Sequence, residues 1–397
     1  MNKTRTTLGA CCGAHVVHDG LTDVLYVLLP LVAQAFGLNY AQVGLIRTAN
    51  RAAMSALQLP AGMLAERCGE RILLVAGTAC AGIGFLALGY SSGFIAILLS
   101  LFLAGCGGAF QHPLSSAMIS HVYPQAGRRT ALGVYNFAGD VGKVGVAGLI
   151  GVMIAAGYSW QTPVLTLGWL TLLCAAVVWI LLASVGTGSR PNRAHAHAEG
   201  ATQTSTWGLR NRQGFIALCS IEVIDGMTRT GFLTFVAFLM LAKGMPEGWA
   251  VLSVPLIALG GMAGKLSCGI LAERYGTVRT IVVTEVASAA GILLVVALPG
   301  AYAFFVLPLV GIALNGTSSA LYGTVGDLVE PERVSRAFGL FYTLGSASGV
   351  VAPVAYGLLA DQIGVAATML AAAAIVMLTI PLCLWLSASL GRTRQYV

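Results

Sequence analysis

The sequence predicts an all-α membrane protein of twelve transmembrane helices, arranged as two six-helix pseudo-symmetric bundles. Two observations predict this fold: a charge-poor, apolar composition and an internal repeat with an offset of about 206 residues. Of the 397 residues, 57% are hydrophobic and only 9% are charged, whereas soluble domains carry roughly 25% charged residues. A bilayer removes the need for a charged surface, because lipid-facing surface is apolar. The composition therefore excludes a water-soluble fold.

Twelve apolar stretches are each long enough to cross a hydrocarbon core of about 30 Å. They fall near residues 9–36, 41–63, 71–90, 94–121, 131–156, 161–184, 214–241, 248–271, 279–298, 301–327, 335–359 and 363–386. A long segment of small and polar residues separates the sixth stretch from the seventh, as is typical of a flexible linker. We therefore expect an N-terminal bundle (1–186), a cytoplasmic linker (187–213) and a C-terminal bundle (214–397).

Basic residues are distributed unevenly between the two sides of the predicted membrane. Sixteen lie in loops on one side, whereas the loops on the other side contain only Lys243. The positive-inside rule then places both termini in the cytoplasm. We expect a multi-pass protein of the bacterial inner (cytoplasmic) membrane. The same asymmetry accounts for the net charge of +7. We therefore expect the lipid bilayer, and not nucleic acid, as the partner of this basic chain.

The two halves match in their loops and in their spans. Residues 62–71, after the second stretch, are repeated at residues 269–279, after the eighth. Further pairs at an offset of 206 are Asp19 with Asp225 and Gly139 with Gly345. Because each half has an even number of spans, both halves have the same orientation in the membrane. In transporters with such parallel repeats, the substrate site lies between the halves near the midplane.

Residues 62–71 read Gly-Met-Leu-Ala-Glu-Arg-Cys-Gly-Glu-Arg and resemble the signature loop of the major facilitator superfamily, with Glu66 in place of the usual Asp. The resemblance covers the whole chain and implies a secondary active transporter with alternating access. A finer resemblance, to the fosmidomycin-resistance branch of efflux proteins, rests on His-Val-Val-His-Asp at 15–19 and Phe-Gln-His-Pro at 110–113. The glycine-rich stretch at 139–151 resembles the antiporter motif of the superfamily.

The signature segment and its repeat are predicted to form a cytoplasmic gate. An acid at a helix end can pair with basic residues and helix N-termini of neighbouring spans in one conformation and release them in another. Because the segment recurs, we favour gating over a turn that carries topogenic charges. The predicted gating residues are Gly62, Glu66, Arg67, Arg71, Lys265, Gly269, Glu273 and Arg274.

Charged side chains inside membrane spans are costly and mark candidate functional sites. His15, Asp19 and Asp23 follow one another at four-residue spacing, so they share one helical face that cannot point at lipid. A partly dehydrated carboxylate beside an imidazole can take up and release a proton. We predict proton coupling at Asp19, assisted by His15, His18 and Asp23. A permanent ion pair between helices is the alternative.

Arg47 and Arg51 share a face of the second span. Two guanidinium groups repel one another unless an anion or carboxylates lie between them. Their partners are either Asp19 and Asp23 or a carboxylate, phosphate or phosphonate of the substrate, bound bidentately. We favour Arg51 for the substrate, with Arg47 nearer the periplasmic mouth.

Two further charged pairs lie within single spans. Asp140 and Lys143 are three residues apart, and Asp225 and Arg229 are four apart, so each pair can interact. Because Arg229 occupies the repeat position of Asp23, we also expect an ion pair between these two that closes the periplasmic side. Other predicted substrate-binding residues, polar or titratable, are Tyr26, Gln111, His112, Asn136, Asn315 and Tyr342.

These patterns predict proton-coupled export of a small organic compound, and the five cations within the spans favour an anion. The alternatives are a proton-coupled importer of a small carboxylate or metabolite, a sensor derived from a transporter, and a metal-ion transporter. The sequence carries no enzyme signature and no phosphate-binding loop for ATP. We expect a monomer without cofactor or metal site, whose partners are the small-molecule substrate, protons and lipid.

Overall fold

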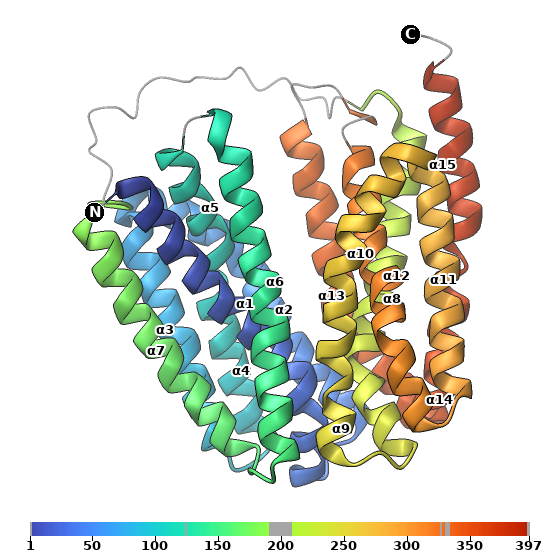
Figure 1. The fold of residues 1–397 in the computed structure, drawn as a ribbon, viewed down its shortest axis with the longest axis horizontal. Helices are drawn as coiled ribbons and strands as arrows, with labels where there is room; N and C mark the ends of the chain where they lie inside the picture. The colour runs from blue at the N-terminus through green and yellow to red at the C-terminus, as the bar shows by residue number, and fades with distance from the viewer. Residues whose placement is uncertain (1, 124, 190–208, 326–327, 330–333, 395–397) are drawn as a thin grey trace. The chain divides into compact units, whose positions relative to one another are not determined.

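The computed structural model describes residues 2–123, 125–189, 209–325, 328–329 and 334–394. The described chain is almost entirely helical (Figure 1), and Leu209 pairs with Val329 in an isolated β-bridge. The helices are α1 (Lys3–Phe36), α2 (Tyr40–Cys68), α3 (Glu70–Gly89), α4 (Phe94–Gly108), α5 (Gln111–Val122), α6 (Gln125–Ala155), α7 (Gln161–Ser184), α8 (Arg212–Ala242), α9 (Glu247–Val251), α10 (Ser253–Tyr275), α11 (Thr277–Ala297), α12 (Gly300–Val325), α13 (Val334–Ile363), α14 (Val365–Val376) and α15 (Thr379–Arg394).

Within the described residues, eleven helical segments are long and apolar enough to cross a membrane. Three of them combine two helices each: α4 with α5, α9 with α10, and α14 with α15. The remaining predicted span is the second along the chain, α2. It carries the polar and charged side chains of Arg47, Asn50 and Arg51. Its 29 residues still reach about 43 Å at a rise of 1.5 Å per residue. The prediction of an all-α membrane protein is confirmed.

The chain divides into two compact units. Unit 1 consists of Met1–Leu38 and Leu45–Ala201, and unit 2 consists of Asn39–Gly44 and Thr202–Val397. Most of the predicted linker (187–213) lies outside the described residues. The predicted domain limits at 186 and 214 stay a prediction.

Unit 1 is built around α1, which packs against α5, α6 and α7. Glycine allows the close approach of α6 to α1, because a side chain at Gly142 would collide with the backbone carbonyl of Val16. Cys11 of α1, Met118 of α5 and Tyr135 of α6 belong to the buried apolar core at this contact. The polar residues of α1 that are described below lie at the same crossing.

Unit 2 is built around α8, which packs against α12, α13, α14 and α15. Leu218 of α8, Leu321 of α12 and Phe341 of α13 are fully buried in its core. Elsewhere in the unit, α10 approaches α12 closely, because a side chain at Gly264 would collide with the carbonyl of Ile312.

Large apolar side chains are exposed in both units. Examples are Trp169 (62% exposed), Phe305 (78%) and Leu384 (67%). Soluble monomers rarely expose extended apolar surface, whereas a bilayer requires it. The exposure pattern is that of a membrane protein.

Candidate functional site

Asp19 lies at the centre of a buried charged cluster in unit 1. Its Oδ1 atom lies 3.3 Å from His15 Nε2, 3.9 Å from His18 Nε2 and 3.7 Å from His112 Nε2. Its Oδ2 atom lies 3.0 Å from the ammonium nitrogen of Lys143. The sequence predicted the group on α1, whereas His112 and Lys143 were assigned to substrate binding. The structure adds these two side chains from α5 and α6 to the same cluster.

Gly139 of α6 creates the space that the cluster needs. A Cβ atom at this position would lie 2.6 Å from His15 Nε2 and 2.7 Å from Asp19 Oδ2. One turn further along α6, Lys143 also bonds to Asp140, at 3.2 Å from its Oδ1. The lysine thus connects carboxylates from α1 and α6. Removing one partner of such a buried pair leaves an uncompensated charge.

The orientation of His15 is fixed by its other ring nitrogen. His15 Nδ1 lies 2.8 Å from the backbone carbonyl of Tyr135, and its ring stacks on the Tyr135 ring with centroids 4.0 Å apart. Because a carbonyl only accepts, Nδ1 carries the hydrogen. In the neutral ring, Nε2 then presents a lone pair to the Asp19 carboxylate. A proton on Nε2 converts this repulsion into a charge-assisted hydrogen bond.

The ligand atoms of His15, Asp19 and His112 lie within 4.8 Å of one another, which is close enough for a metal ion to join them. Imidazole nitrogen and carboxylate oxygen are ligands that Zn²⁺ accepts. The ammonium group of Lys143, however, lies 3.0 Å from the second oxygen of the same carboxylate. Its positive charge opposes the binding of a divalent cation at this position.

Arg47 is the most deeply buried cation of α2, at 1% exposure, whereas Arg51 is half-buried. The Arg47 guanidinium carbon lies 4.3 Å from the centroid of the Tyr26 ring. Its Nη1 atom donates to Asn50 Oδ1 at 3.4 Å. Nε and Nη2 have no hydrogen-bond partner among the described residues. A buried guanidinium with two unsatisfied donors is well suited to an anionic oxygen.

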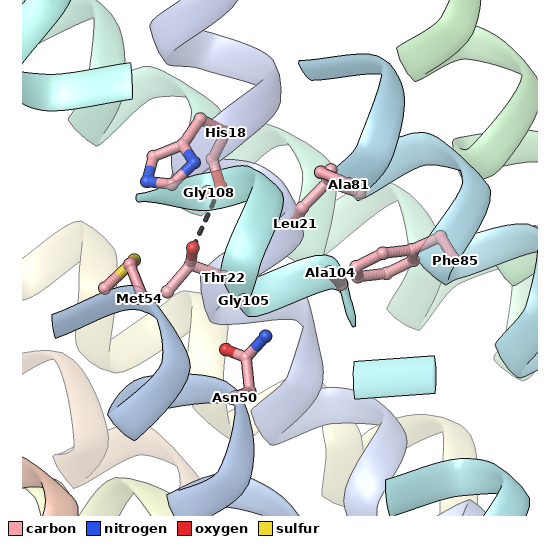
Figure 2. A pocket seen from close by; sticks show the side chains of 10 residues that line it. All are labelled: His18, Leu21, Thr22, Asn50, Met54, Ala81, Phe85, Ala104, Gly105 and Gly108. Atoms are coloured by element: carbon pink, nitrogen blue, oxygen red, sulfur yellow. Dashed lines mark hydrogen bonds between the residues drawn. The ribbon is translucent and has the colours of Figure 1, made fainter. Parts of the chain in front are cut away.

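A small pocket lies beside the cluster, between α1, α2, α3 and α4 (Figure 2). His18 and Thr22 of α1 and Asn50 of α2 give it a polar side, and Phe85 of α3 closes the apolar side. Gly108 of α4 admits the imidazole of His18, since a Cβ atom there would lie 2.9 Å from its Cε1 atom. The pocket thus reaches a member of the Asp19 cluster.

Unit 2 contains a different charged cluster. Arg229 Nη2 lies 4.0 Å from Asp225 Oδ2, one turn away on α8. Glu285 of α11 interacts electrostatically with Asp225 and Arg229, and also with Glu222 of α8. As charges within membrane spans, these two glutamates are functional candidates from the sequence, but no role in the site was predicted for them. The predicted pairing of Asp23 with Arg229 joins different units and stays a prediction.

The remaining predicted substrate-binding residues have varied surroundings. Gln111 is 3% exposed, and neither atom of its amide has a partner among the described residues. Asn136 is exposed. Asn315 donates to the Gly311 carbonyl at 3.3 Å, and Tyr342 is 50% exposed. Gln111 is therefore the member of this group whose hydrogen-bonding capacity is buried and unused.

The two copies of the signature segment turn at equivalent glycines. Gly69 follows α2 with φ of 86°, and Gly276 follows α10 with φ of 93°, values that L-residues with side chains rarely adopt. Arg71 lies 5.0 Å from the centroid of the Trp179 ring. Arg67 and Arg274 are exposed, Lys265 is half-buried, and the side chains of Glu66 and Glu273 lie outside the described part. Gly62 and Gly269 face open space. The gating role stays a prediction.

Comparison with known proteins places these features in a family. The family model of the Major Facilitator Superfamily matches residues 11–323 and 248–394. Over 94% of this chain and 90% of the relative, the sequence is 25% identical to the uncharacterized MFS-type transporter YfnC of Bacillus subtilis. It is 22% identical to the fosmidomycin resistance protein of Escherichia coli, over 91% and 88% of the two chains. It is also 22% identical to the probable sulfoacetate transporter SauU of Cupriavidus necator, over 91% and 89%.

Solved structures share the fold. A bacterial homolog of the human lysosomal transporter Spinster, inward-facing and unoccupied, matches with a TM-score of 0.83 and 17% identity over 99% of this chain and 98% of that chain. The nucleoside transporter NupG matches with a TM-score of 0.76 and 13% identity over 96% and 99%. The chain belongs to the major facilitator superfamily, and it is a secondary transporter of the membrane rather than an enzyme.

Proposed function

We propose that this transporter is an antiporter that couples the entry of protons to the efflux of a small organic anion, with Asp19 and His15 together as the coupling pair. The observation that carries the proposal is the buried contact of Asp19 with His15 Nε2 at 3.3 Å and with Lys143 at 3.0 Å. When His15 carries a proton on Nε2, two cations hold the Asp19 carboxylate. When the proton leaves, a lone pair faces the carboxylate, and only Lys143 attracts it.

This difference biases the packing of α1 against α5 and α6. A bound ligand shifts an equilibrium between conformations only by its differential affinity for them. The proton meets this condition, because it changes the contact between His15 and Asp19 from repulsive to attractive. Lys143, shared between Asp19 and Asp140, can move toward either carboxylate as the proton enters or leaves.

Arg47 supports an anionic substrate. Its Nε and Nη2 atoms, which have no hydrogen-bond partner among the described residues, can bind a carboxylate or a phosphonate as a fork. Relatives are named for fosmidomycin resistance, for multidrug resistance (MdtL of Klebsiella pneumoniae) and for sulfoacetate and 4-hydroxybenzoate transport. The two resistance names favour efflux. Import of a small carboxylate by proton symport is the alternative.

The decisive experiment measures flux in inside-out inner-membrane vesicles with an acidic lumen. The panel contains fosmidomycin, sulfoacetate and 4-hydroxybenzoate, with EDTA present throughout. Antiport predicts that a substrate accumulates in the lumen and that the proton ionophore CCCP abolishes the accumulation. Symport predicts loss of preloaded substrate from the lumen instead. Asp19→Asn should stop flux driven by the pH gradient, and the exposed control Glu247→Gln should not. Gradient-driven flux at the wild-type rate in Asp19→Asn would contradict the proposal.

A metal ion is the second candidate substrate, because His15, Asp19 and His112 can converge on one ion. The same vesicles, without EDTA and with Zn²⁺ in place of the organic panel, test it. Zinc flux that is lost in His112→Ala would favour metal transport. The charge of Lys143 leads us to expect no such flux.

We also propose a monomer in the inner membrane with both termini in the cytoplasm. The sixteen basic residues on one side of the predicted membrane support this orientation. A reporter enzyme that works only in the cytoplasm should be active when it is fused at either terminus. One that works only in the periplasm should be inactive there. After chemical crosslinking in membranes, the protein should migrate at the mass of a single chain.

A further inference from the structure

Unit 2 buries three carboxylates that the Asp19 site does not use. Glu222 and Asp225 of α8 are 2% and 1% exposed, and Glu285 of α11 is 0% exposed. Arg229 of α8 lies beside them, with its Nη2 atom 4.0 Å from Asp225 Oδ2. This distance is longer than a hydrogen bond. The Arg229 side chain is 22% exposed and that of Asp225 is 2% exposed, so the cluster is more accessible at Arg229 than at its carboxylates.

Four of the six carboxylate oxygens are buried and lack hydrogen-bond partners among the described residues. This applies to both oxygens of Glu285, to Oε2 of Glu222 and to Oδ2 of Asp225. The groups that act on Glu285 electrostatically are Asp225, Arg229 and Glu222 of α8 and the thiol of Cys383 of α15. Tyr322 of α12 interacts electrostatically with Glu222 and Asp225.

The charge balance of this cluster is unfavourable when every acid is ionised. Three carboxylates would then face one guanidinium in a dehydrated interior, where unpaired charge costs several kcal/mol per ion. Such groups bind a proton instead. Glu285 is the most buried of the three, and neither of its oxygens has a hydrogen-bond partner in the part of the chain that the structure describes. It is therefore the acid best placed to hold that proton.

The internal repeat supports the same conclusion. Gly345 of α13, the repeat partner of Gly139, makes room for Glu222, since a Cβ atom there would lie 2.6 Å from Glu222 Oε1. The glycine at this helix crossing thus admits a carboxylate in both units. Lys143 has Gly349 at its repeat position. The repeat position therefore carries no ammonium like the one that compensates Asp19, and a proton can take its place.

We propose that Glu285, together with Glu222 and Asp225, forms a second proton-binding site, located in unit 2. The site exchanges its proton through the side of the cluster where Arg229 is exposed. The proposal follows from burial and charge in unit 2 and does not require the Asp19 mechanism. If both hold, each unit of the transporter binds its own proton.

Infrared difference spectroscopy of the purified, reconstituted protein between acidic and alkaline pH tests this site. Protonated carboxylic acids have a carbonyl stretching band that carboxylates lack. The wild type should show a titrating band, and Glu285→Gln should lose about one proton equivalent of it. Glu222→Gln should shift the midpoint of the titration. The exposed control Glu247→Gln and the unit 1 variant Asp19→Asn should keep the Glu285 component.

Glutamine is the neutral isostere of a protonated glutamate, so Glu285→Gln should fold and elute as a monodisperse peak, like the wild type. An unchanged titrating band in the folded variant would overturn the proposal. Loss of the wild-type band in Na⁺ but not in choline buffer would also overturn it, in favour of a sodium site. Failure of gradient-driven flux would refute the proposed transport function and leave this band in place, so the two failures are distinguishable.

Discussion

Replacing Lys143 with methionine is expected to destabilise unit 1, because it removes the ammonium that two aspartates share. The Lys143 nitrogen lies 3.0 Å from Asp19 Oδ2 and 3.2 Å from Asp140 Oδ1. One such contact is worth about 5 kcal/mol of Coulomb energy at an effective dielectric constant of 20. The lysine side chain is 29% exposed, so solvent screening reduces the figure. We expect a loss of about 2–4 kcal/mol.

The assay is thermal unfolding of the purified protein in detergent, followed by intrinsic fluorescence. Lys3→Met, which removes an exposed lysine at the start of α1, is the matched control and should leave the melting temperature unchanged. Asp19→Asn in the Lys143→Met background removes the orphaned carboxylate charge, so the double variant should recover part of the loss. A melting temperature of Lys143→Met equal to that of the wild type would refute this electrostatic reasoning.

Three further predictions concern the Asp19 cluster, the binding of an anion by Arg47, and the predicted ion pair between Asp23 and Arg229. Gly139→Ala should cost about 1–3 kcal/mol of stability and slow transport, because its Cβ atom would lie 2.6 Å from His15 Nε2. Gly133→Ala, with open space around the glycine, should be neutral in the same melting assay. Arg47→Lys should raise the KM for an anionic substrate at least about tenfold, because lysine cannot bind an anion as a fork; an unchanged KM in vesicle flux would exclude Arg47 from binding. Exchanging the charges of Asp23 and Arg229 together should restore flux that each single reversal abolishes, and no recovery would reject the predicted pair.

The glycine at equivalent crossings explains how one scaffold carries two different charged clusters. Gly139 and Gly345 lie at the same repeat position and each faces a carboxylate. The surrounding charges differ, with Lys143 in unit 1 and none at Gly349 in unit 2. The repeat preserves the packing geometry, while individual substitutions set the chemistry in each half.

The sequence by itself determined the membrane fold, the spans and the repeat. The length of an apolar stretch is a local property of the sequence, and it decides whether the stretch can cross the bilayer. The recurrence of residues 62–71 at 269–279 is visible without coordinates. Spacing along a helix also placed His15 beside Asp19, because residues four apart share a face. These conclusions depend only on neighbours within one helix.

The tertiary structure alone decided which charges meet across helices. His112 and Lys143 join Asp19 because α5 and α6 present these faces to α1. Likewise, Glu285 acts on the carboxylates of α8 from α11. Helical periodicity gives the face of a residue but not the rotation of the helix about its axis. That rotation is set by the packing of whole helices, in which a glycine such as Gly142 or Gly264 decides how closely two backbones approach, while Gly139 and Gly345 leave room for charged side chains.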